Sequence, residues 1–207
     1  MKLVKLPLVP VLLTLVLFLG ACSTVTPEPE PNDPPPMPEM GRDGLASLEA
    51  QTGEGFDIAY MSQLIEHHTG AIDVAGTAQQ HVERQEVKDA TTMVISSQAE
   101  EIATLTGWLR DWYTTNPDAA ERALVTKDSA LSIEYAKAAI ERSDPDRAFL
   151  ERIIPHHRRA IEMSQLALEK ATRPELREFA QGVIDMQSAE IAQYQTWLEA
   201  WYGVTLP

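Results

Sequence analysis

Apolar side chains recur at steps of three and four residues along four stretches of the chain, the spacing at which an α-helix brings residues to one face. The first stretch runs from Phe56 to Ala75 without a proline, and the second runs from Val87 to Trp112. The third and fourth, over residues 149–164 and 176–201, repeat these two patterns in the same order. The chain is therefore predicted to form four amphipathic helices, grouped as two helix pairs.

The second pair is a copy of the first, because residues 57–113 and 146–202 match without a gap at an offset of 89 residues. Two such copies bury their apolar faces most readily against one another. We expect an all-α four-helix bundle made of two tandem helix hairpins joined by a long helical crossover. Within a bundle domain at 45–207, the predicted parts are repeat one at 56–114, the crossover at 115–144 and repeat two at 145–203.

Short local signals predict where helices begin and bend. Ser143-Asp144-Pro145-Asp146 places a capping residue and then a proline at the start of the third helix, and Thr172 with Glu175 forms a candidate capping box for the fourth. Pro155 falls inside the third helix, where we expect a bend or a local opening. In the crossover, Ala130 to Arg142 is expected to be helical.

The first 21 residues have the form of a secretory signal peptide. Lys2 and Lys5 precede an apolar run at 6–19 that is too short to span a bilayer comfortably. The run ends in Leu19-Gly20-Ala21-Cys22, which resembles the lipobox of bacterial lipoproteins, where the peptide is cut before a cysteine that then receives the lipid. The alternative is an ordinary secreted protein with an incidental cysteine.

Cys22 is the only cysteine, which favours the lipoprotein interpretation and excludes an internal disulfide. Residues 22–44 are rich in proline and acidic residues and are predicted to be an extended tether. Since Ser23 rather than aspartate follows the cysteine, the lipoprotein sorting rule favours the outer membrane, facing the periplasm, in a Gram-negative cell. The expected location is thus the cell envelope, with the lipid on Cys22 as the membrane contact.

The formal net charge of −14 at pH 7 excludes an electrostatic footprint for nucleic acid or a polybasic membrane patch. Loss of Lys2 and Lys5 with the signal peptide changes this charge to −16. Such a charge attracts cations weakly but does not by itself make a site.

Polar side chains occupy helix positions that the periodicity assigns to the interior. His68 and His157 lie near the middle of the apolar stripes, while His67 lies about 100° away on the flank of its stripe. A buried, unpaired carboxylate costs several kcal/mol, so a core glutamate needs a cation, a metal or a proton nearby. Packing about a pseudo-twofold axis predicts that imidazoles, carboxylates and amides meet in one region: His67, His68, His156, His157, Glu101, Glu190, Gln98 and Gln187.

Imidazole and carboxylate together suit Zn, Cu, Fe or Ni. Met61, Met163 and Met186 are possible additional ligands, and a thioether beside imidazole shifts the preference towards copper, particularly Cu(I). The alternative for the methionines is core filling. For the histidines, the alternative is a closed His–Glu hydrogen-bond network that only fixes the helix register.

These residues resemble the bacterial family of domain of unknown function 305, which has a His-His pair followed by Ala-Ile, and then a Gln-x-x-Glu-Ile helix that ends in a Trp-Leu element. The resemblance covers roughly residues 45–205 and implies an exported, ferritin-like four-helix bundle, with copper binding or tolerance in some relatives. Family members often have a methionine seven residues after the first histidine of each pair. Here Met163 fits, but Val74 stands in the first copy.

A ferritin-like fold also raises the possibility of a di-iron oxidase, which needs four carboxylates and Glu-x-x-His pairs. No histidine in the chain has an acidic residue three positions before it, so we expect no enzyme of this kind. Two hypotheses remain. The first is a lipid-anchored metal-binding protein that buffers or scavenges copper or a similar ion. The second is a metal-free structural or interaction module that binds a protein partner or another copy of itself.

Overall fold

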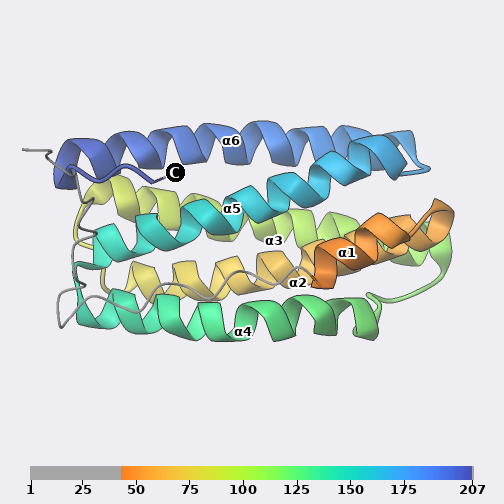
Figure 1. Ribbon diagram of the computed structural model, residues 1–207, viewed down its shortest axis with the longest axis horizontal. Coiled ribbons are helices and arrows are strands. Elements are labelled where there is room, and N and C mark those ends of the chain that lie inside the picture. Colours follow the sequence, from red (N-terminus) through yellow and green to blue (C-terminus); the bar gives the residue numbers. More distant parts are fainter. Residues whose placement is uncertain (1–42, 207) are drawn as a thin grey trace, which may run out of the picture. The chain divides into compact units, whose positions relative to one another are not determined.

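The computed structural model describes residues 43–206, apart from the side chains of residues 128–131, and this part of the chain is helical throughout except for short connections. Figure 1 shows its helices: α1 (Asp43–Ala50), α2 (Gly53–Gln79), α3 (Gln85–Tyr113), α4 (Ala119–Arg142), α5 (Pro145–Lys170) and α6 (Pro174–Tyr202). The predicted signal peptide, Cys22 and nearly all of the predicted tether lie outside the described residues. None of the described helices combines the length and the apolar character needed to cross a lipid bilayer.

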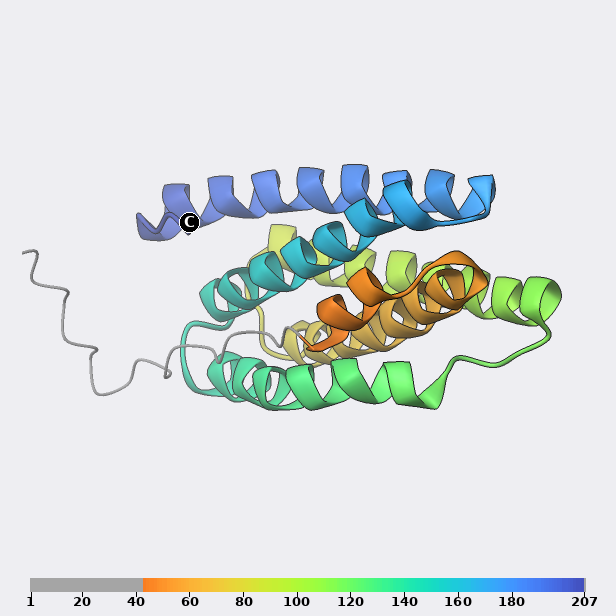
Figure 2. The same ribbon diagram turned by 45° about the vertical axis from the view of Figure 1, so that its right-hand side comes forward.

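The helices form two hairpins that pack on one another. α2 pairs with α3, α5 pairs with α6, and α2 contacts α5 at the centre of the bundle. α4 packs against both α2 and α5, on the side of the bundle opposite to α6 (Figures 1 and 2). The predicted all-α, ferritin-like bundle of two hairpins with a helical crossover is confirmed.

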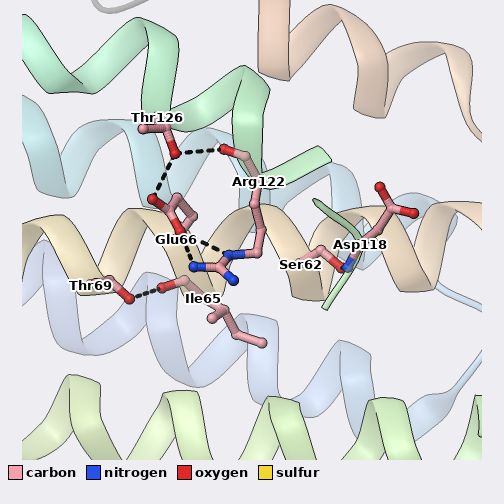
Figure 3. Close-up of polar contacts among 7 residues, drawn as sticks. All are labelled: Ser62, Ile65, Glu66, Thr69, Asp118, Arg122 and Thr126. Atoms are coloured by element: carbon pink, nitrogen blue, oxygen red, sulfur yellow. Dashed lines mark hydrogen bonds and ion pairs between the residues drawn. The ribbon is translucent and has the colours of Figure 1, made fainter. Parts of the chain in front are cut away.

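The crossover helix α4 begins at Ala119, earlier than the predicted Ala130. The carboxylate of Asp118 caps it by accepting hydrogen bonds from the backbone N–H groups of Ala120 and Glu121, both at 2.9 Å. The extra turns are tied to α2, as Figure 3 shows. Glu66 accepts two hydrogen bonds from Arg122, at 2.7 and 2.8 Å, and one from the Thr126 hydroxyl at 2.7 Å.

The start of α5 agrees with the predicted cap, because Asp144 accepts a hydrogen bond from the backbone N–H of Arg147 at 2.9 Å and Pro145 is the first helical residue. The helix continues through Pro155 without a break, so the predicted local opening is absent from α5. The predicted capping box of the fourth helix is wrong. α6 begins at Pro174, and the Thr172 hydroxyl donates to Asp57 instead.

Two buried aspartates join the hairpins by capping each other's loops. Asp57 at the start of α2 accepts the backbone N–H of Thr172, at 3.0 Å, from the loop between α5 and α6. Asp146 at the start of α5 accepts the backbone N–H of Glu83, also at 3.0 Å, from the loop between α2 and α3. Asp57 and Asp146 are 89 residues apart, and so are Glu83 and Thr172, so each repeat completes the loop of the other.

The apolar core is divided into two clusters along the length of the bundle. One contains Leu64, Leu105 and Met163, and the other contains Ala71, Phe149 and Tyr194. Along α2 and α5, the buried histidine pairs fall between the stretches that belong to the two clusters. The polar groups therefore form a belt across the middle of an otherwise apolar interior.

Candidate metal centre

The centre of the polar belt is a pair of histidines, His67 from α2 and His156 from α5. Their ring centroids are 3.7 Å apart, with 37° between the ring planes, and both side chains are buried. None of their four ring nitrogens has a hydrogen-bond partner among the described residues. Buried polar atoms without a partner are rare in folded proteins and point to a role that the protein alone does not complete.

A histidine–glutamate contact lies on either side of this pair. Nε2 of His68 is 2.8 Å from Oε2 of Glu101, and Nε2 of His157 is 3.0 Å from Oε2 of Glu190. In both contacts the histidine is fully buried, while 12% of the glutamate side chain is exposed. These are close polar contacts between an imidazole nitrogen and a carboxylate oxygen, although they do not meet the geometry of a hydrogen bond.

The four imidazoles form a continuous series across the bundle. The rings of His67 and His68 are 6.1 Å apart, and those of His156 and His157 are 6.4 Å apart. With the central pair, these contacts link α3, α2, α5 and α6 through one row of polar side chains that begins at Glu101 and ends at Glu190.

Burial keeps the two central histidines neutral. Loss of solvent, reinforced by the neighbouring imidazoles, lowers the pKa of both His67 and His156 well below the usual 6.5. At neutral pH each ring therefore keeps one nitrogen lone pair, the form of imidazole that binds a metal ion.

The crossover helix approaches this pair at Gly70. A Cβ atom there would lie 2.8 Å from Cδ1 of Ile133 in α4 and 3.9 Å from Nε2 of His156. The missing side chain thus leaves room for Ile133 of α4 to approach α2 close to the central pair.

The other predicted residues divide into buried and exposed ones. Gln98 and Gln187 are buried, and the Oε1 atom of each lacks a partner among the described residues. Met61 and Met163 are buried in one apolar cluster. Met186 is 42% exposed, so the structure does not bring it into the buried belt.

The six main candidate ligands form three pairs and not one cluster. Within the described part of the chain, no three His, Cys, Asp or Glu side chains are grouped closely enough to hold a metal ion. The arrangement instead offers two neutral, facing imidazoles, with a carboxylate beside each flanking histidine. Neutral imidazole is a ligand for copper, zinc, iron and nickel, so the chemistry of these donors fits a transition-metal ion.

Sequence reasoning missed the loop-capping residues Asp57 and Asp146. Both follow from the same duplication that identified the histidines, because they are identical residues at equivalent positions of the two repeats. It also missed Tyr60, whose buried hydroxyl is 2.9 Å from that of Ser164 and links α2 to α5. No duplicated signal marks this contact, since Phe149 and Ala75 stand at the equivalent positions.

Comparisons with known proteins agree with the fold, and some of the similar solved structures hold a metal ion. The model of the family "Domain of unknown function (DUF305)" matches residues 20–109 and 146–206. Solved structures of CopM in Cu(I)-bound and Cu(II)-bound forms are 30% and 27% identical, each with a TM-score of 0.61. They match over 71% and 70% of this chain and 98% and 97% of CopM.

CopM has also been solved with silver bound. A DUF305 protein from Streptomyces coelicolor is 18% identical with a TM-score of 0.62, covering 70% of this chain and 91% of that protein, and this likeness concerns the fold alone. A search of curated protein sequences gives no match.

Proposed function

Because the chain belongs to the DUF305 family, we propose that it binds copper or a similar soft metal ion in the bacterial cell envelope, as a buffer or scavenger. The proposed ligands are the buried histidines, with Glu101 and Glu190 as further ligands or as groups that orient the flanking imidazoles. The lipid on Cys22 and the proline-rich tether complete the proposal by holding the bundle at the membrane.

The observation that carries this proposal is the His67–His156 pair. Two imidazoles that face each other at 3.7 Å, both neutral and both without a hydrogen-bond partner in the described chain, are costly to bury unless a ligand uses their lone pairs. A metal ion bound at a ring nitrogen would use one of these lone pairs and so offset part of that cost. The structures of CopM with Cu(I), Cu(II) and Ag support the choice of ion.

The proposal includes no catalytic reaction. A ferritin-like oxidase would need Glu-x-x-His pairs, and the residues three positions before His67, His68, His156 and His157 are Leu64, Ile65, Ile153 and Ile154. Fold likeness alone does not supply that chemistry.

Elemental analysis of the purified full chain after exposure to Cu(I) or Ag(I) tests the proposal. The unsubstituted protein should retain a fixed number of ions per chain, and His67→Ala or His156→Ala should lose at least one of them. His81→Ala is the matched control, because His81 is exposed and has no counterpart in the second repeat. An unchanged ion content in both core variants would contradict the assignment.

The second candidate function is a metal-free bundle in which the polar belt only fixes the helix register. The His68–Glu101 and His157–Glu190 distances of 2.8 and 3.0 Å favour it, since such contacts stabilise one arrangement of helices without an ion. In that case the unsubstituted protein retains no ion, and its melting temperature does not rise when Cu(I) or Ag(I) is added.

A further inference from the structure

A pocket of about 400 Å³ opens between α3 and α6, the two helices that flank the central α2–α5 contact. Its walls are mainly apolar. The residues that matter for its chemistry are Asp89, Ala90 and Met93 from α3, and Glu190, Tyr194 and Trp197 from α6.

Two side chains in the wall of this pocket contact the buried histidine His157. Oε2 of Glu190 is 3.0 Å from Nε2 of His157, and the ring of Tyr194 is centred 6.1 Å from the imidazole. Glu190 therefore lines the pocket and also contacts the polar belt through its carboxylate. An ion held in the pocket would be one carboxylate away from the first of the four imidazoles.

The pocket combines two kinds of donor that attract soft cations. Met93 is 59% exposed, so its thioether side chain can be reached from solvent. Thioethers bind Cu(I) and Ag(I), while the carboxylates of Asp89 and Glu190 attract any cation. The net charge of the chain, −14, adds a long-range attraction.

The equivalent place in the other half of the bundle is built differently. At an offset of 89 residues, Ala90 corresponds to Phe179 and Met93 corresponds to Gly182. The Phe179 ring packs edge-on against Trp108, with centroids 5.5 Å apart. The first half therefore carries an aromatic side chain and a glycine at the positions where the pocket beside Glu190 has Ala90 and Met93.

We propose that this pocket is the entry site for the metal ion, with the sulfur of Met93 and the carboxylate of Glu190 as its first ligands and His157 as the next. The inference rests on the proposed metal-binding function and adds the path by which the ion reaches the histidines. Ions reach the belt from the α3–α6 side and arrive at the His157 end before the His68 end.

Stopped-flow measurement of Ag(I) uptake by the full chain tests this route, because Ag(I) stays in one oxidation state. Trp197 lines the pocket, so its fluorescence should change as the ion arrives. Met93→Leu removes the sulfur but keeps the size, and Ala90→Phe introduces the side chain that repeat two has at this position. Both should slow uptake about tenfold, within the range over which association rates vary among variants of one site.

Met186→Leu is the matched control, since Met186 is also an exposed methionine but does not line the pocket. Its uptake rate should stay within about twofold of the unsubstituted protein. The final number of bound ions should be unchanged in all three variants, because the histidines are intact.

The outcomes separate the two proposals. Failure of the unsubstituted chain to bind Ag(I) contradicts the proposed function itself. Normal binding with equal uptake rates in Met93→Leu, Ala90→Phe and the control overturns only the entry site. Should Ala90→Phe not fold, Met93→Leu decides alone. A pocket that binds an apolar dye while neither substitution slows Ag(I) uptake would belong to an apolar ligand, which also overturns the inference.

Discussion

The two histidine–glutamate contacts are almost the same, but their surroundings differ. His68–Glu101 and His157–Glu190 have distances of 2.8 and 3.0 Å and equal burial. An open pocket lies beside the second, lined by Ala90, whereas the equivalent residue in the first half is Phe179, which packs against Trp108. The duplication has thus kept the paired imidazole and carboxylate and varied the residues around them.

The same contrast appears deeper in the core. Tyr60 and Ser164 share a hydrogen bond in one half, whereas Phe149 and Ala75 occupy the equivalent positions in the other. Similar helices therefore hold together by a polar contact on one side of the belt and by apolar packing on the other.

The largest expected effects on the free energy of unfolding come from substitution of the loop-capping aspartates, Asp57 and Asp146. Asp57 accepts hydrogen bonds from the backbone and hydroxyl of Thr172 and from the Tyr113 hydroxyl, at 2.6 Å for the last. Among the described residues, Asp146 accepts hydrogen bonds from backbone N–H groups and lies 4.0 Å from Nε of Arg84, while Tyr202 donates to Asp144 instead. Asp57→Ala should lower the free energy of unfolding by about 3 kcal/mol and Asp146→Ala by about 2 kcal/mol. Chemical denaturation measures both free energies, and equal losses would show that the two hydroxyl contacts of Asp57, from Thr172 and Tyr113, add nothing.

The central pair belongs to both halves and should make stability depend on pH. Burial lowers the pKa of His67 and His156 in the folded chain, whereas the unfolded chain titrates near 6.5. Below pH 6.5 the unfolded chain therefore binds more protons, and the metal-free protein should lose about 1.4 kcal/mol per pH unit for each histidine. Denaturation midpoints at several pH values between 7.5 and 5.5 measure the slope.

His67→Gln should reduce this slope, since it removes one of the two groups, and His81→Ala serves as the control. A metal-free protein whose stability stays constant or rises on acidification would contradict the neutral state of the pair.

The smallest expected loss of stability comes from replacing Tyr60 with the phenylalanine that stands at the equivalent position of the other repeat. Tyr60→Phe leaves the buried Ser164 hydroxyl without its partner and should cost about 1 kcal/mol. The double variant Tyr60→Phe/Ser164→Ala reproduces the Phe149 and Ala75 side chains of the other half. It should cost less than the two single substitutions together, as a double-mutant cycle can measure. Strict additivity would mean that the 2.9 Å contact contributes no coupling.

The sequence predicted most of the fold because its signals are local and repeated. The three- and four-residue spacing predicted α2, α3, α5 and α6, and the duplication identified the buried histidines. Thr172 shows the limit of such signals, since its expected role at the start of α6 depended on nearby sequence alone. A distant carboxylate, Asp57, takes its hydroxyl instead.

The candidate site was predicted in composition but not in arrangement. His67 was placed on the flank of its helix, yet it is one of the two central residues, because α2 and α5 cross where their first histidines meet. Helix periodicity gives the direction of a side chain from its own axis but not the rotation of one helix against another. The exposure of Met186 has the same origin, since its place outside the belt depends on how α6 is turned.

Asp57 and Asp146 each cap a loop of the other repeat, and this affects how the two repeats can evolve. Two separate chains, each one hairpin long, could close on each other through these same contacts as a symmetric dimer, but every substitution would then occur twice. Joining both hairpins in a single polypeptide fixes their stoichiometry at any concentration and lets one copy be altered alone. Phe179 in one half and Ala90 in the other are a difference that is possible only when both hairpins belong to one chain.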